Sequence, residues 1–240
     1  MRHYHTPIKY KKYILLLILI LISCLDQLKA QEYEYEIGGG VGTAFYMGDA
    51  NKTNLFQSPN IATGAVFRYN HNFRWAYKAN LLVGGVSGNT NKSGNVFPNN
   101  ENSSFSRTFC ELGTQVEFNF FHYSDKYQYL GTKKISPYIF TGLGITYGSG
   151  DASFVGLNLP LGMGIKYKLK DRLNLGFEFS FRKLFGDNFD VTNKQGSFDL
   201  EDPYNIKSSF FKNKDWYLLS LFSITWDFGQ RKNSCVNSLY

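Results

Sequence analysis

The chain has 240 residues and a formal net charge of +7, with 22 Phe, 17 Tyr, 23 Gly and only 3 Cys. This length suits one domain of moderate size, and the few cysteines indicate neither a disulfide framework nor a zinc site. Removal of residues 1–30 as a signal peptide would take away five positive charges and one negative charge, which lowers the net charge to +3 and gives no indication of nucleic-acid binding.

The first expected element is this signal peptide, over residues 1–30. Basic residues between Arg2 and Lys12 precede the apolar run Ile14–Ile22. The run is too short to cross a bilayer as a helix, but it suits the apolar centre of a signal peptide with cleavage after Ala30. A second interpretation stays open, because "LISC" resembles a lipobox and would make Cys24 the lipidated first residue.

Eight strand-like segments follow the signal peptide. Their expected ranges are 33–46, 60–71, 74–88, 106–121, 136–148, 154–169, 172–186 and 215–228. Several of them are longer than the roughly 5–6 residues of a typical soluble strand. An even number of long strands indicates an all-β fold, an eight-stranded antiparallel transmembrane β-barrel of the outer membrane, closed because lipid satisfies no backbone group. We expect the barrel over residues 31–229 and a periplasmic tail over residues 230–240.

The stretch from Phe154 to Gly186 shows the alternation most clearly. Every second residue is apolar, so one face of each strand is apolar. Both apolar sets have odd numbers, and a turn with an odd residue count at 170–172 keeps them on the same side of the sheet. The unbroken apolar face is typical of a barrel wall in lipid. The predicted lipid-facing residues are Leu157, Leu161, Ile165, Leu175, Phe177, Phe179 and Phe181.

Charged residues occupy the opposite face. The segment "TFCELGTQVEFNFF" places Glu111 and Glu117 there, and burying these acids without partners would be costly. We therefore expect them to pair with basic residues inside the barrel, as side chains that fill a narrow lumen rather than as catalytic or transport groups. The predicted lumen polar network is Glu111, Glu117, Lys166, Lys168, Glu178 and Arg182.

The connections between segments differ in length. The joins at 70–74 and 170–172 are tight, whereas those at about 47–59, 89–105 and 187–214 are long and polar. Outer-membrane barrels have short periplasmic turns and longer external loops, so both termini are expected in the periplasm. Aromatic residues near the strand ends are expected at the two headgroup levels. They include Tyr46, Phe105 and Tyr217 at the outer rim, and Tyr123 and Tyr138 at the inner rim.

Candidate sites for chemistry are few. His122 and Ser124 share a strand face, like the His-x-Ser pair of outer-membrane lipid A deacylases, but they fall at the end far from outer-leaflet lipid. The carboxylates at 187–190 and 199–204 lack the fixed ligand pattern of a calcium loop. The glycines of "GGGVG" (38–42) are expected to permit close packing or bending of the first strand. No catalytic, metal or cofactor residue is assigned, and no cofactor or small-molecule substrate is expected.

Several phrases occur in an order that resembles a known family. They include "YEIGGGVGTAFYMGD", "FRYNHNFRWAYK", "SPYIFTGLG", "LPLGMGIKYKL" and "KDWYLLSLFSITWDF". Over roughly residues 33–229 they are similar to a family of Bacteroidota outer-membrane β-barrels that includes PorG, a component of the type IX secretion system.

The resemblance implies a non-enzymatic, structural role in protein transport. Its implied partners are outer-membrane lipid and a periplasmic ring formed by a PorK-like lipoprotein and PorN. Three alternatives stay open: a stand-alone structural or adhesive barrel, a lipid-modifying enzyme and a narrow pore.

Overall fold

The structure is a computed structural model, and it describes residues 33–47, 56–89, 104–126, 129, 131–150, 153–170, 172–185, 189 and 215–230. The expected signal peptide, Cys24, the tail beyond residue 230 and the acidic loop segments at 187–188, 190 and 199–204 lie outside the described residues. In the part of the chain that is described, there is no helix long and apolar enough to cross a membrane.

Eight strands make up the fold, each within two residues of its expected range at either end. They are β1 (Tyr33–Met47), β2 (Asn60–Asn70), β3 (Trp75–Asn89), β4 (Ser104–Asn119), β5 (Ile135–Gly148), β6 (Phe154–Lys170), β7 (Leu173–Leu184) and β8 (Trp216–Gln230). The last strand runs one residue past the expected barrel end at 229.

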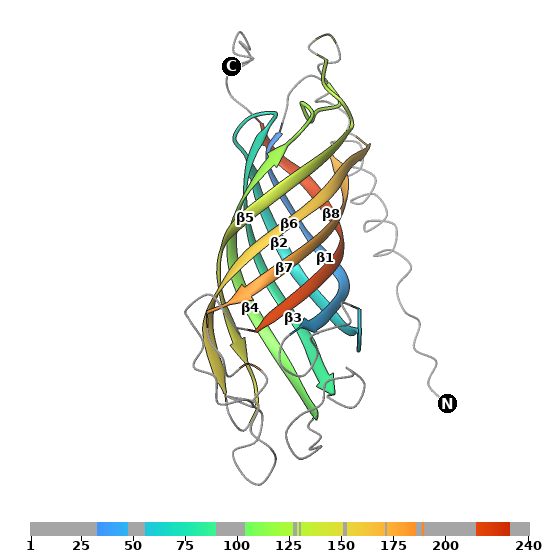
Figure 1. Ribbon diagram of the computed structural model, residues 1–240. Coiled ribbons are helices and arrows are strands. Elements are labelled where there is room, and N and C mark those ends of the chain that lie inside the picture. Colours follow the sequence, from blue (N-terminus) through green and yellow to red (C-terminus); the bar gives the residue numbers. More distant parts are fainter. Residues whose placement is uncertain are drawn as a thin grey trace, which may run out of the picture.

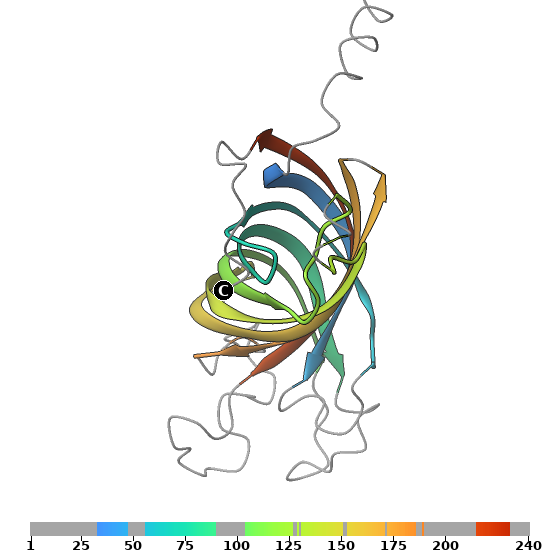
Figure 2. The same ribbon diagram turned by 90° about the horizontal axis from the view of Figure 1, so that it is seen from above.

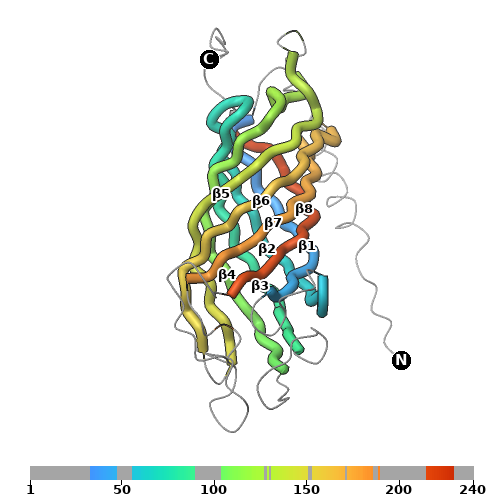
Figure 3. Tube along the Cα trace, in the orientation of Figure 1, coloured from blue at the N-terminus to red at the C-terminus, as the bar shows by residue number. Residues whose placement is uncertain are grey.

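The strands form one closed antiparallel barrel (Figure 1). Each strand pairs with its neighbours in the chain, and β8 closes onto β1, as the view along the barrel shows (Figure 2). The strands run obliquely around the barrel (Figure 3), as a closed sheet requires. The expected eight-stranded antiparallel barrel is therefore confirmed.

The two ends of the barrel are distinct. One end carries the β2–β3, β4–β5 and β6–β7 turns, and there Tyr33 at the start of β1 pairs with Gln230 at the end of β8. We call it the short-turn end, and it lies at the top of Figure 1. The opposite end, called the long-loop end, lies where β1, β3, β5 and β7 finish.

The register between β6 and β7 keeps the apolar residues on one face. Leu161 pairs with Phe181, and Ile165 pairs with Phe177. This pairing is the one that an odd-numbered turn predicts, because a slip of one residue would send one apolar set to the other face. The pairing shifts between Lys168 and Lys170, which places a β-bulge beside the turn.

Pro160 does not produce the local bulge that its position in a strand suggests. Thr141 pairs with Leu161 and Gly144 with Asn158, so the register is unchanged and the ladder is only interrupted between them. Proline has no N–H to donate, which explains an interruption without an inserted residue.

The glycines of β1 lie at the seam where the barrel closes. A Cβ at Gly38 would lie 2.0 Å from the backbone oxygen of Ile224, and one at Gly42 would lie 1.9 Å from that of Ser220. The glycines therefore permit close packing of β1, as expected from the sequence, and the structure shows that the strand packed against them is β8. A larger residue at either position would force the seam apart.

Candidate functional site

The outer wall of the barrel is apolar and exposed. Leu157 is 56% exposed, Leu161 42% and Ile165 48%, and Leu175 and Phe177 are exposed as well. Phe179 and Phe181 lie on the same face but are half-buried, because their rings pack edge to face with centroids 5.3 Å apart. An apolar surface of this extent marks contact with lipid or protein rather than water. With a charged interior, it makes the fold an eight-stranded barrel of the outer-membrane type.

Buried charges fill the lumen near the short-turn end. Each carboxylate there lies beside at least one cation, and all of these side chains are buried. We call this set the lumen ion network, and it comprises Glu36 (β1), Arg68 (β2), Lys78 (β3), Glu117 (β4), Lys166 and Lys168 (β6), Glu178 (β7) and Asp227 (β8). Its four carboxylates balance its four cations, so the pairing offsets much of the desolvation cost of each charge.

Glu117 is the centre of the network. It accepts from Arg68 Nε at 2.9 Å, lies 3.3 Å from Lys78 Nζ, and also accepts from Lys166 Nζ. Arg68 in turn donates to Glu36. One carboxylate on β4 therefore ties together strands β2, β3 and β6, and Arg68 extends the link to β1.

Two further contacts complete the network. Lys78 Nζ donates to both oxygens of Glu178, at 2.6 and 2.7 Å, and the Tyr138 hydroxyl of β5 donates to the same carboxylate at 2.6 Å. Lys168 Nζ donates to Asp227 at 2.7 Å. With Tyr138 included, all eight strands contribute a polar side chain to this region.

A separate ion pair lies on the long-loop side of the network. Arg182 Nε donates to Glu111 at 3.0 Å. Asn80 donates to the other Glu111 oxygen at 3.0 Å, and the Tyr217 hydroxyl donates to the same oxygen as Arg182. Glu111 is thus paired and hydrogen-bonded on both oxygens, as a buried carboxylate must be.

All six residues named from the sequence for the lumen lie inside the barrel. Four members of the lumen ion network were not predicted from the sequence: Glu36, Arg68, Lys78 and Asp227. The same alternation could have found them. Arg68 lies between the outward-facing Phe67 and Tyr69, for example, so parity alone assigns it to the lumen.

Aromatic and aliphatic side chains fill the other half of the lumen. We call this set the aromatic plug, and it comprises Ala44, Tyr46, Ala62, Leu82, Val86, Phe105, Phe109, Phe154, Leu184, Phe189, Tyr217, Leu219 and Leu221. The expectation that Tyr46, Phe105 and Tyr217 face the headgroups is wrong, because all three are buried. Each of the three occupies the same alternate positions of its strand as the inward-facing charged residues, so its side chain faces the lumen.

The β4–β5 turn folds over the lumen at the short-turn end. Tyr123 is buried, and its hydroxyl donates to Asn174 at 3.1 Å. Its backbone N–H donates to the Phe73 carbonyl at 3.1 Å, which holds the turn in place. Burial raises the pKa of the Tyr123 hydroxyl well above its usual range, so the group stays a donor. Tyr123 and Tyr138, expected at the headgroup level, therefore point into the lumen instead.

His122 and Ser124 do not form a catalytic pair in this structure. His122 Nε2 accepts from Arg74 Nε at 3.1 Å, and Ser124 Oγ accepts from the Lys126 backbone N–H at 3.2 Å. Ser124 is buried, and no hydrogen bond between the two side chains occurs among the described residues. A serine nucleophile needs a base within hydrogen-bond reach, which this geometry does not provide.

Within the described ranges, no three His, Cys, Asp or Glu side chains come together as a metal site would require. Cys110 is a free thiol.

Several solved structures are similar to this chain, and three of them are described here. Neisserial surface protein A has 10% identity and a TM-score of 0.49, covering 81% of this chain and 97% of that one. The attachment invasion locus protein Ail of Yersinia pestis has 11% identity and a TM-score of 0.45, with coverages of 82% and 99%. The N-terminal barrel domain of Pseudomonas aeruginosa OprF has 10% identity and a TM-score of 0.40, with coverages of 82% and 100%.

No curated protein matches the chain. Residues 11–237, which include the whole barrel, match the family described as "Domain of unknown function (DUF6089)", and the chain belongs to that family.

Proposed function

We propose that the protein is a non-enzymatic outer-membrane β-barrel that anchors a periplasmic protein complex, with both termini in the periplasm. The observation that carries this proposal is the contrast between its two surfaces. The outer wall is exposed and apolar, whereas the lumen is filled by paired charges and packed rings. Such a wall is stable in hydrocarbon, and a lumen filled by side chains is a poor conduit.

The function then lies at the ends of the barrel. At the short-turn end, the β4–β5 turn presents three exposed side chains, Tyr129, which is 80% exposed, Lys133 and Lys134. Exposed tyrosine is enriched at contact surfaces between proteins. We assign this end to the periplasm because outer-membrane barrels keep their short turns there.

The partner that we propose is the ring of a type IX secretion system, formed by a PorK-like lipoprotein and PorN. Two observations support this proposal. Residues 33–229 resemble the barrel family that includes PorG, and the filled lumen leaves the two ends of the barrel as the surfaces on which a partner could bind. The protein would hold the ring against the outer membrane rather than pass substrates itself.

Crosslinking in intact cells tests this proposal. A photo-crosslinking amino acid at Tyr129 should capture the periplasmic lipoprotein or its ring partner. The same amino acid at Lys183, near the long-loop end of β7, is the matched control and should capture neither. Deletion of the gene should also reduce type IX secretion. An unchanged secretome with no adduct from Tyr129 would overturn the proposal and favour a stand-alone structural or adhesive barrel.

Two further measurements separate the remaining alternatives. Ser124→Ala should leave the lipid A profile unchanged, since the serine has no base in reach. The purified barrel should show no steady conductance in a planar bilayer. A changed lipid A profile would indicate an enzyme, and steady conductance would indicate a pore.

A further inference from the structure

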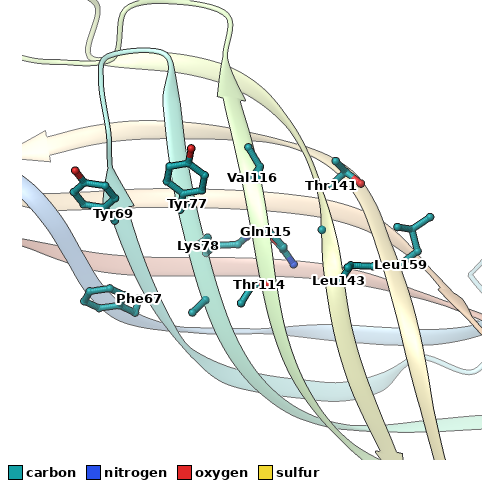
Figure 4. A pocket seen from close by; sticks show the side chains of 12 residues that line it. Phe67, Tyr69, Tyr77, Lys78, Thr114, Gln115, Val116, Thr141, Leu143 and Leu159 are labelled. Atoms are coloured by element: carbon teal, nitrogen blue, oxygen red, sulfur yellow. The ribbon is translucent and has the colours of Figure 1, made fainter.

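A groove crosses the outer wall over β2 to β6 (Figure 4). Its volume is about 520 Å³. Its small lining residues are Ala79, Thr114, Thr141 and Gly142, and Ala79 pairs with Thr114. Larger apolar and aromatic side chains border it, namely Phe67, Tyr69, Tyr77, Val116, Leu143 and Leu159. The groove is therefore a depression in a wall that elsewhere carries large residues.

The interrupted ladder between β5 and β6 lies at one side of the groove. Leu143 and Leu159 line the groove and fall within the interruption beside Pro160. At the other side, the rings of Tyr69 and Tyr77 stack with centroids 6.3 Å apart. Their hydroxyls point toward the β2–β3 turn, at the short-turn end (Figure 4).

Three basic side chains stand above the groove at that end. Arg74 Nε donates to His122 Nε2 at 3.1 Å, and the Lys133 backbone N–H donates to the His122 carbonyl at 2.8 Å. The Lys133 ammonium lies 4.0 Å from the ring centre of Phe121, which is 40% exposed. We call Arg74, His122 and Lys133 the rim cluster.

The rim cluster is available to bind an anion. Neither Arg74 nor Lys133 forms an ion pair with a carboxylate in the described part of the chain. The bond to His122 uses one of the five N–H donors of the guanidinium group, which leaves others that can reach a phosphate.

The spacing between groove and rim cluster matches one leaflet of a bilayer. From Thr114 to Asn119, where β4 ends, five residues at ~3.3 Å each and a strand tilt of ~40° span about 13 Å along the barrel axis, and the rim cluster lies beyond that end. Half of a hydrocarbon core of ~30 Å is about 15 Å. A groove near the middle of the membrane thus lies under charges at the headgroup level.

We propose that this face binds one anionic phospholipid of the leaflet at the short-turn end. The acyl chain fills the groove, and Arg74, His122 and Lys133 bind the phosphate. The Tyr69 and Tyr77 hydroxyls lie between chain and headgroup, at the level where amphipathic rings are stable. This inference rests on the membrane location proposed above and goes beyond the proposed secretion role.

Native mass spectrometry of the full chain, released from nanodiscs of mixed phosphatidylglycerol and phosphatidylcholine, tests the site. The unaltered protein should retain one phosphatidylglycerol in preference to phosphatidylcholine. Lys133→Gln should lower that preference about fivefold, and the further change Arg74→Gln should lower it about fivefold again. Thr114→Phe should fill the groove and reduce retention of both lipids.

Two control variants sit elsewhere on the outer wall. Lys183→Gln removes a positive charge on β7 near the long-loop end, and Ser220→Phe adds a ring on β8, and both should retain lipid as the unaltered protein does. Equal retention of the two lipids by the unaltered protein, or an unchanged preference in Arg74→Gln/Lys133→Gln, would overturn the site. A chain that fails to enter nanodiscs would overturn the membrane location as well, so the two failures are distinguishable.

Discussion

Charges fill the half of the lumen near the short-turn end, whereas packed rings fill the half near the long-loop end. In the charged half, Glu117 is shared by three cations, so each partner depends on the others. In the aromatic half, Phe109 and Tyr217 pack with ring centroids 5.0 Å apart, and each ring stabilises the barrel mainly through the apolar surface that it buries. One narrow barrel lumen can therefore be filled in two ways, by ion pairs between particular residues or by the packed volume of apolar side chains.

The two halves should therefore respond differently to substitution. Loss of one member of a charged set leaves buried partners without compensation, while loss of a ring leaves a cavity. Both responses can be measured as the free energy of unfolding of the barrel in phosphatidylcholine vesicles, by urea titration and tryptophan fluorescence.

The largest effect is expected for Glu117→Ala. Arg68, Lys78 and Lys166 would lose their shared carboxylate, and the free energy of unfolding should fall by about 3–5 kcal/mol. Glu117→Gln keeps the shape of the side chain but removes its charge, so its loss should be smaller. A loss under about 1 kcal/mol for Glu117→Ala would contradict the interdependence of the network.

Phe109→Ala tests the aromatic plug. Phe109 is buried in the lumen, and its removal should cost about 3 kcal/mol through lost apolar contact and a residual cavity. Phe109→Leu, which keeps most of the volume, should cost less than half as much. Equal costs for Ala and Leu would show that the plug is not packed as described.

The pair of Glu111 and Arg182 lies between the two halves of the lumen. Substitutions in this pair test whether its two side chains depend on each other as those of the lumen ion network do. Arg182→Met should cost about 2 kcal/mol, because Asn80 and Tyr217 still donate to Glu111. Glu111→Leu combined with Arg182→Met should cost less than the sum of the single changes by at least about 1 kcal/mol. Additive costs would mean that the two side chains act independently.

The smallest effect is expected for Tyr123→Phe. It removes one hydrogen bond, to Asn174, and should cost about 1 kcal/mol. Because the β4–β5 turn covers the lumen through this residue, limited proteolysis of the folded barrel within residues 120–135 should become faster. A proteolysis rate equal to that of the unaltered protein would show that the turn does not depend on this bond.

The strands could be predicted from the sequence, because apolar residues at every second position over a long segment fit a strand and do not fit the 3.6-residue period of a helix. The same alternation places Glu111 and Glu117 inside the barrel. It also places Arg68 and Tyr46 there, although Arg68 lies in a short strand and Tyr46 lies near a rim, where exposure to water or headgroups is the simpler expectation.

Other features depend on packing that a single sequence does not specify. The inward fold of Tyr123 depends on contacts with Asn174 and the Phe73 backbone, far from it in the chain. The groove depends on the lateral pairing of small residues on β3, β4 and β5, which requires the registers of all three strands.

Spin labelling along β6 tests most directly whether lipid covers the outer wall around a filled lumen. The three cysteines of the chain, Cys24, Cys110 and Cys235, would first be replaced by Ser, and single labels would then be placed at each position from Leu157 to Tyr167 in vesicles. Accessibility to lipid-soluble oxygen should peak at the odd positions and fall at the even ones, with a water-soluble nickel reagent excluded from both. High nickel accessibility at Leu161 and Ile165 would contradict the account, because it would place water where hydrocarbon is required.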